Sequence, residues 1–300
     1  MVDTHADRAT RPRHPAPAAL LELLKPITWF APMWAFMCGV VSSGVPISEN
    51  WLTLLLGVLL AGPLVCGTSQ AVNDWFDRHV DAINEPNRPI PSGRVPGRWG
   101  LGLGIVWTVL SLGVALLLGV WVAVAAAIGL ALAWAYSAPP FRLKQNGWFG
   151  CLTVGACYEG LPWFTGAAAM SGQFPSTPIL LLAGLYSLGA FGIMALNDFK
   201  AVEGDRQLGL KSLPVLLGVR GAALLACAVM TVPQFVVVGL LFSWGAPVHA
   251  ALVAALVAVQ VILMVRLLED PRRYAAWYNA TGTTLYVLGM LASAFALSSG

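Results

Sequence analysis

Residues 73–94 read NDWFDRHVDAINEPNRPIPSGR, a charged stretch in an otherwise apolar chain. If its first part is helical, Asp74, Asp77 and Asp81 stand at positions i, i+3 and i+7 and fall within about 60° of one helix face. Three carboxylates on one face repel one another unless they share a cation. Ligation by oxygen alone suits Mg²⁺, which leaves other coordination positions to water and substrate phosphate. Taken alone, the stretch predicts either a magnesium site or a solvated cap on a membrane helix.

The composition excludes an ordinary water-soluble protein. The 300 residues are 58% hydrophobic and 10% charged, and the mean hydropathy is +0.74. Apolar runs of about 20 residues recur, each long enough to cross roughly 30 Å of hydrocarbon. Because these runs are continuous rather than alternating, they predict an all-α polytopic membrane protein. The net charge of +3 does not suggest a nucleic-acid partner, and five cysteines without a CxxC pair imply neither disulfides nor zinc.

The apolar runs predict about nine transmembrane helices. They lie near residues 26–45, 51–72, 99–117, 119–137, 148–170, 178–197, 221–243, 246–268 and 278–298. Residues 1–24 begin with a polar segment rich in proline and arginine and are predicted to form a disordered tail. Residues 25–300 are predicted to form a single transmembrane domain.

The positions of the cations predict the orientation. All 17 lysines and arginines lie in the N-terminal tail or at the connections that follow the second, fourth, sixth and eighth spans. The other connections contain none. Under the positive-inside rule, the N-terminus and the basic connections are cytoplasmic, and nine spans place the C-terminus on the opposite side.

A second acidic stretch, NDFKAVEGDR at 197–206, follows the sixth predicted span. Asp198 and Asp205 are seven residues apart and would be nearly eclipsed on a helix. The acidic motifs at 73–81 and 197–205 both open with Asn-Asp after an apolar run, which indicates two weakly repeated halves. Two such motifs on one membrane face predict a polar cavity between helices, because ionisable groups beside hydrocarbon are costly.

Carboxylates combined with cations suit a diphosphate. Carboxylates alone would repel this anion, whereas Mg²⁺ held by them and surrounded by Arg and Lys would bind it. Residues 136–144 (YSAPPFRLK) add a phenol and two cations after the fourth span, and the diproline predicts a rigid turn. Membrane anchoring under the positive-inside rule explains the two cations equally well.

These motifs resemble a known family. The NDxxDxxxD pattern at 73–81 is similar to the signature of the UbiA superfamily of intramembrane prenyltransferases, and residues 136–144 resemble its tyrosine- and proline-containing basic loop. The strings DAINEPNRPIPSGR (81–94), CYEGLPWFTGAA (157–168) and NDFKAVEGDRQLGLKSLPV (197–215) resemble the chlorophyll and bacteriochlorophyll synthase branch, most of all the bacteriochlorophyll synthases of purple bacteria. The resemblance implies a UbiA-type bundle of helices.

The resemblance also implies a reaction and a cofactor. A C20 prenyl group, geranylgeranyl or phytyl, would pass from its diphosphate to the propionate carboxylate of bacteriochlorophyllide a, with release of diphosphate. The implied Mg²⁺-binding and catalytic residues, with two supporting asparagines, are Asp74, Asp77, Asp81, Asp198, Asp205, Asn73 and Asn197. The implied diphosphate contacts are Arg88, Arg142, Lys144, Lys200, Lys211 and Tyr136. Weaker candidates for pigment contact are Trp75, Tyr158, Glu159 and Trp163; aromatic residues near a membrane interface are more often anchors.

The second motif departs from the family pattern at one position. Many members carry an aspartate where this chain has Ala201, so Asp198 and Asp205 are left as its metal-facing pair. Glu203 is rotated by about 140° from Asp198 on an ideal helix, which places it on another face unless the helix ends early.

Other functions remain as alternatives. Within the enzyme class these are a chlorophyll a synthase that uses chlorophyllide a and a UbiA-type prenyltransferase for a quinone or haem precursor. A cation-coupled transporter is the alternative from another class, although carriers hold their site near the bilayer midplane and both acidic motifs lie at one face. The implied pathway places the chain in the lipid bilayer of a bacterial photosynthetic inner membrane, with a cytoplasmic active site and other pigment-pathway membrane proteins as candidate partners.

Overall fold

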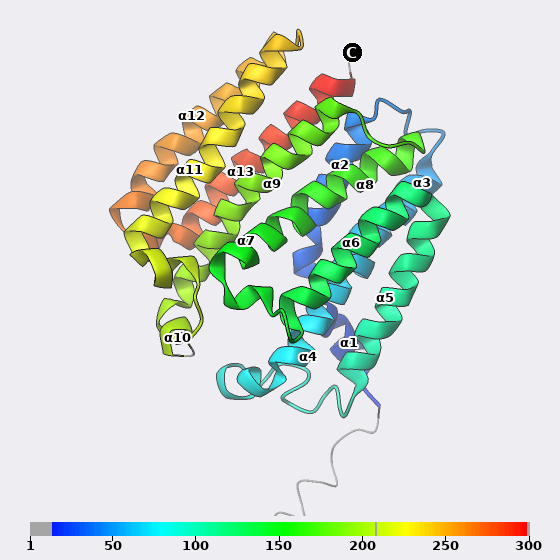
Figure 1. Ribbon diagram of the computed structural model, residues 1–300, viewed down its shortest axis with the longest axis vertical. Coiled ribbons are helices and arrows are strands. Elements are labelled where there is room, and N and C mark those ends of the chain that lie inside the picture. The colour runs from blue at the N-terminus through cyan, green and yellow to red at the C-terminus, as the bar shows by residue number, and fades with distance from the viewer. Residues whose placement is uncertain (1–13, 208, 299–300) are drawn as a thin grey trace, which may run out of the picture.

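The computed structural model describes residues 14–207 and 209–298, which fold into a bundle of helices (Figure 1). The elements of the first half are α1 (Pro17–Leu24), η1 (Pro26–Trp29), α2 (Phe30–Ser42), α3 (Trp51–Leu59), η2 (Leu60–Cys66), α4 (Gly67–Asn84), α5 (Trp99–Leu118) and α6 (Val120–Ser137). Those of the second half are η3 (Leu143–Gln145), α7 (Gly147–Gly155), η4 (Ala156–Gly160), α8 (Leu161–Ser171), α9 (Thr177–Asn197), η5 (Asp198–Lys200), α10 (Val202–Gln207), α11 (Leu213–Ser243), α12 (Pro247–Glu269) and α13 (Pro271–Ser298). The segments η2 and η4 are π-helical, and the other three η segments are 3₁₀ turns.

The structure confirms an all-α polytopic membrane fold. Eight helices within the described residues are long and apolar enough to cross a membrane. The predicted span at 148–170 is not among these eight, although it falls on the unbroken helical run α7–η4–α8. This run contains Glu159 as well as several glycines and a proline, which make it less apolar than its neighbours. The third and fourth predicted spans are separate helices, because Gly119 between them adopts φ 117°.

The polar connections gather at one end of the bundle. In Figure 1 the end of α4 and the short helix α10 lie at the bottom, whereas the C-terminus lies at the top. The acidic motifs therefore share one end of the molecule, and the C-terminus lies at the other.

The predicted disordered tail is wrong in its last part. Residues 1–13 lie outside the described residues, so that portion of the prediction has no structural counterpart. Residues 17–24 form α1, with Pro17 at its first position, where a proline is tolerated. Helix α1 is ordered because Ala19, Leu23 and Leu24 pack into an apolar cluster with Ala71 and other residues of the bundle.

Helices α2 and α8 make backbone-to-backbone contact. A Cβ at Gly39 would lie 2.0 Å from the Trp163 carbonyl oxygen, and one at Gly166 would lie 2.1 Å from that of Phe36. Small residues allow such close approach of membrane helices. The indole of Trp163 donates a hydrogen bond to Ser42 Oγ at 3.0 Å, so this interface holds α2 against α8.

Two π-helical turns interrupt long helices, and the second of them lies in the wall of the interior cavity described below. The first, η2, contains Pro63, which has no backbone N–H to continue the α-helical ladder. The second, η4, contains Glu159. Such bulges redirect side chains and are frequent at functional sites.

A candidate active site between two acidic motifs

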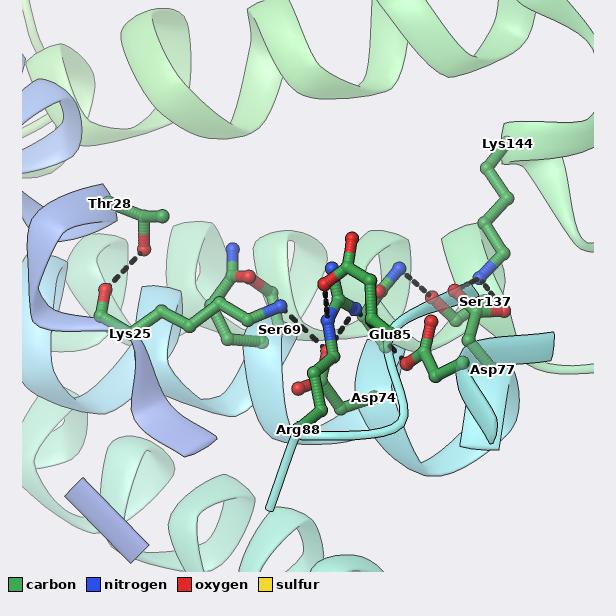
Figure 2. Close-up of polar contacts among 12 residues, drawn as sticks. Lys25, Thr28, Ser69, Asp74, Asp77, Glu85, Arg88, Ser137 and Lys144 are labelled. Atoms are coloured by element: carbon green, nitrogen blue, oxygen red, sulfur yellow. Dashed lines mark hydrogen bonds and ion pairs between the residues drawn. The ribbon is translucent and has the colours of Figure 1, made fainter. Parts of the chain in front are cut away.

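The first acidic motif lies on one unbroken helix, α4, as predicted. Asp74 and Asp81 are buried and Asp77 is half-buried, whereas His79 on another face is exposed. Figure 2 shows Asp74 and Asp77 projecting from α4 toward side chains of other segments. The spacing of these aspartates therefore places them on the interior side of the helix.

Each of these carboxylates meets a cation from another part of the chain, and Figure 2 shows the contacts of Asp74 and Asp77. Lys25 Nζ lies 2.7 Å from Asp74 Oδ1, and Lys144 Nζ lies 2.5 Å from Asp77. Arg88 Nη1 lies 3.0 Å from Asp81 Oδ2 and 3.4 Å from Asp74 Oδ1. Of the predicted cations, Arg88 and Lys144 thus pair with aspartates of the first motif.

Lys25 is a site residue that the sequence interpretation missed. It lies in the left-handed region at φ 47° between α1 and η1, and it reaches an aspartate 49 residues away. The available signal was its place beside Pro26, where the first apolar run begins, at the same end of the bundle as the acidic motifs.

Burial and charge oppose each other at Lys144. Burial lowers the pKa of Lys144 from its ordinary value, and the adjacent Asp77 carboxylate acts in the opposite direction. The partner of this lysine is therefore the group that maintains its charge.

The second acidic motif does not lie on a continuous helix, so its predicted helical geometry is wrong. Helix α9 ends at Asn197, Asp198 begins the 3₁₀ turn η5, and Asp205 lies on the separate helix α10. At this break Phe199 and Val202 are buried, and Ala201 leaves the helical conformation at φ −109°.

The break still leaves Asp198 and Asp205 near each other. Both are half-buried, and Asp205 acts electrostatically on Asp198, as does Lys200. Glu203 instead points outward, with its side chain 60% exposed, and pairs with Arg272 at 3.0 Å. Asp198 and Asp205 are therefore the interior carboxylates of this motif.

Tyr136 joins the two motifs. It lies at the end of α6, close enough to Asp77 and to Asp198 for both carboxylates to act electrostatically on its hydroxyl. Arg142 lies farther along the same loop, where its Nε is buried without a hydrogen-bond partner. The loop therefore adds a phenol and a guanidinium between the acidic motifs.

Backbone hydrogen bonds join the loop that precedes α7 to the loop that precedes α11. The Gly147 N–H donates to the Lys211 carbonyl at 2.8 Å, and the Lys211 N–H donates to the Gln145 carbonyl at 3.1 Å. Gly147 is required at this crossing, because a Cβ there would lie 2.6 Å from the Leu213 nitrogen. Asn146 then caps α7 by accepting hydrogen bonds from the backbone N–H groups of Trp148 and Phe149. The side chains of Lys200 and Lys211 are exposed.

A cavity of about 650 Å³ extends from the acidic motifs into the bundle. Asn73, Tyr136 and Asn197 line its polar end. Most of the remaining wall is apolar and comes from η1, α2, α6, α9 and α13. Ile27, Phe30 and Thr284 line it and are also exposed at the surface of the bundle. The cavity therefore combines a polar end with a long apolar interior, as ligand sites for amphipathic molecules do.

The four predicted pigment contacts separate in the structure. Tyr158 and Glu159 line the cavity. Trp75 instead lies under the Arg78 guanidinium at 4.2 Å, outside the cavity wall. Trp163 is 0% exposed and stacks on Tyr186, so no face of its indole is open to a pigment and that prediction is wrong.

The donor set fits Mg²⁺. The carboxylates of the two motifs and the amides of Asn73 and Asn197 are oxygen ligands of the kind that this ion prefers, and Asp74 Oδ2 is buried without a hydrogen-bond partner. Among the described residues, no three His, Cys, Asp or Glu side chains already converge on one point, and lysine and arginine nitrogens contact the carboxylates of α4. A metal ion entering here would replace those ammonium and guanidinium partners.

Comparisons with known proteins agree with this arrangement. The model of the UbiA prenyltransferase family matches residues 28–297. The chain is 58% identical to the bacteriochlorophyll synthase 33 kDa chain of Cereibacter sphaeroides over 94% of both chains. It is 40% identical to the chloroplastic chlorophyll synthase of Oryza sativa subsp. japonica, covering 93% of this chain and 76% of that one. Its fold matches the structure of a UbiA homolog from Archaeoglobus fulgidus bound to GPP and Mg²⁺, with a TM-score of 0.74, 19% identity and coverage of 94% and 100%.

Proposed function

The chain belongs to the UbiA prenyltransferase family, and from this premise we propose that it acts as a bacteriochlorophyll synthase. It transfers a geranylgeranyl or phytyl group from the diphosphate to the propionate carboxylate of bacteriochlorophyllide a. The observation that carries the proposal is the pair of acidic motifs at the polar end of one long apolar cavity. The 58% identity to a bacteriochlorophyll synthase over nearly the whole chain supports this acceptor.

The aspartates of both motifs hold the metal in this proposal. Asp74, Asp77 and Asp81 supply carboxylates from α4, and Asp198 and Asp205 supply them from the opposite motif. Bound Mg²⁺ neutralises the diphosphate and stabilises it as a leaving group. Asn73 and Asn197, which line the same end of the cavity, support the ligands through their side-chain amides.

The cations of the site bind the outer diphosphate oxygens. Lys25, Arg88 and Lys144 pair with the aspartates that would hold the metal, and their N–H groups would be free to donate to phosphate once those carboxylates bind it. Arg142 and the Tyr136 hydroxyl approach from the loop after α6, and Lys200 and Lys211 from the loop after α9. The site thereby exchanges internal ion pairs for ion pairs with the substrate.

The chemical step needs little proton transfer. The C–O bond between the prenyl group and diphosphate breaks, the electron pair leaves with the diphosphate, and a propionate oxygen forms the new C–O bond of the ester. This acceptor is ionised at neutral pH, so no general base is assigned. The apolar wall of the cavity keeps water away from the allylic cation that develops on the prenyl carbon.

The chain is a multi-pass membrane protein, and we place its active site on the cytoplasmic side of a bacterial photosynthetic inner membrane. The one-sided distribution of lysine and arginine supports this orientation. The exposed residues at the cavity mouth, Ile27 and Phe30, give a lipid-soluble substrate access from the bilayer.

An esterification assay tests the proposal. Purified protein in detergent and lipid receives Mg²⁺, geranylgeranyl diphosphate, and either bacteriochlorophyllide a or chlorophyllide a, with EDTA in a parallel reaction. We expect an EDTA-sensitive ester on bacteriochlorophyllide a. A preference for chlorophyllide a would assign the chain to the other branch, and prenylation of 4-hydroxybenzoate or protohaem alone would overturn the tetrapyrrole acceptor.

A further inference from the structure

Three buried polar atoms in the cavity have no hydrogen-bond partner. They are Glu159 Oε2 on η4, and Thr283 Oγ1 and Asn279 Oδ1 on α13. All three residues line the same cavity, with Asn279 at its polar end, where its side-chain amide donates to Asn197 Oδ1 at 2.9 Å. A buried polar atom without a partner costs free energy, and three of them in the wall of one cavity indicate a ligand that supplies the missing partners.

Glu159 is the most unusual of the three. It is 3% exposed, and none of the ion pairs in the described part of the chain includes it. An unpaired charge in an apolar interior is costly, so a ligand that accepts a hydrogen bond from the acid form of this carboxyl group would supply the partner that Glu159 lacks.

The prenyl diphosphate does not account for this group. Its tail has no hydrogen-bonding atom, and its diphosphate belongs with the cations of the acidic motifs, which lie at the end of the cavity marked by Asn73 and Asn197. The acceptor does offer partners, since the tetrapyrrole carries carbonyl groups on its rim. Bacteriochlorophyllide a has an acetyl group at the position where chlorophyllide a has a vinyl group, which cannot accept a hydrogen bond.

We propose that Glu159, assisted by the Thr283 hydroxyl, donates a hydrogen bond to the acetyl oxygen of the acceptor and thereby selects bacteriochlorophyllide a over chlorophyllide a. The inference rests on the proposed function, since it assigns a subsite for that acceptor. The π-helical turn η4 carries Glu159 in the cavity wall, and Thr283 lies on α13 in the same wall. The pair acts on recognition of the acceptor and leaves the bond-making groups at the acidic motifs unchanged.

Acceptor preference is the measurement that tests this subsite. For Glu159→Leu we expect kcat/KM for bacteriochlorophyllide a to fall about tenfold, which corresponds to loss of one hydrogen bond to substrate. The value for chlorophyllide a should stay level or rise, and the KM for geranylgeranyl diphosphate should not change. Glu159→Gln keeps an N–H donor of nearly the same shape and should retain the wild-type preference.

Thr283→Val is the second variant, and Thr281→Val is its matched control. Thr281 lies on the same helix, but its hydroxyl already donates to the Trp277 carbonyl at 2.9 Å. Valine at 283 should shift the preference in the same direction as Glu159→Leu by a smaller factor, whereas valine at 281 should leave it unchanged. Binding of each pigment without prenyl diphosphate, followed by its visible absorption, should show the same order of affinities.

The outcomes distinguish a failure of the proposed function from a failure of the acetyl subsite. A wild-type protein that esterifies neither tetrapyrrole overturns the proposed function itself. If wild-type protein is active and Glu159→Leu and Thr283→Val lose activity equally on both pigments, or keep the wild-type preference, the acetyl subsite is overturned while the function stands.

Discussion

Asp74, Asp77 and Asp81 project from the unbroken helix α4, whereas Asp198 and Asp205 lie on either side of a break between η5 and α10. The carboxylates of the first motif are paired with Lys25, Arg88 and Lys144. Among the described residues, neither aspartate of the second motif forms an ion pair with lysine or arginine. Two motifs that begin with the same Asn-Asp dipeptide are therefore electrostatically unlike.

The difference indicates how the site accepts a metal. In the first motif a metal ion would have to displace cations that are already in place, and the displaced cations would become available to the diphosphate. In the second motif a metal ion would meet carboxylates that form no ion pair in the described residues, although Lys200 acts on Asp198 at longer range. We expect the second motif to gain more from metal binding, and the first to define where the substrate phosphates lie.

The largest expected effect tests whether both motifs are essential. Asp77→Asn and Asp198→Asn should each reduce ester formation by about 100-fold or more, because each removes a carboxylate that stabilises charge at the reacting centre. The measurement is turnover with bacteriochlorophyllide a at saturating Mg²⁺, alongside size-exclusion chromatography to verify folding. Near-wild-type turnover of either folded variant would remove that motif from the metal site.

The second-largest effect is expected in the free energy of unfolding without metal, which should differ between variants of the two motifs. Asp74→Asn should lower the free energy of unfolding by about 1–3 kcal/mol, because it breaks hydrogen bonds to the charged groups of Lys25 and Arg88. Asp198→Asn should leave stability unchanged or raise it, since it removes an unpaired carboxylate close to Asp205. Thermal unfolding in EDTA measures both. Equal destabilisation by the two substitutions would contradict the comparison.

A smaller effect is expected in the loop between the motifs. Arg142→Ala should raise the KM for geranylgeranyl diphosphate about tenfold, the equivalent of one charge-assisted hydrogen bond, with little change for the pigment. Arg94→Ala is the control, because Arg94 pairs with Glu22 at the surface and should leave both constants unchanged. An effect of Arg142→Ala on the pigment alone would reassign this loop to the acceptor.

The smallest effect is expected at the exposed acid of the second motif. Glu203→Gln should change turnover by less than about twofold, since this side chain pairs with Arg272 outside the cavity and an exposed pair contributes little. A Michaelis–Menten series against wild type measures this directly. A loss comparable to that of Asp198→Asn would place Glu203 among the metal ligands.

The sequence predicted the first motif better than the second for a physical reason. The spacing of Asp74, Asp77 and Asp81 agrees with α-helical periodicity, and the helix continues through all three. No glycine or proline marks the end of α9 at Asn197. The break there accompanies the burial of Phe199 and Val202, which depends on contacts that local spacing cannot show.

Contacts between side chains that lie far apart in the chain could not be predicted from the sequence pattern either. Lys25 reaches Asp74 from another segment, and Thr283 shares the cavity with Glu159 although α13 is the last helix. Trp163 shows the opposite case. Its place in a string that resembles the family predicted a pigment contact, but its indole is covered by packing against Tyr186. Apolar periodicity identifies membrane helices, but tertiary packing decides which of their side chains meet.

The close contact between α2 and α8 has a consequence for the time course of biosynthesis. Ser42 and Trp163, joined by a hydrogen bond across this contact, are 121 residues apart in the chain. At a synthesis rate of about 5–20 residues per second, roughly 6–24 s pass between the synthesis of Ser42 on α2 and that of Trp163 on α8. During that interval Gly39 lacks the Trp163 carbonyl that lies against it in the folded chain, and the helices made in between must leave this face of α2 open for α8.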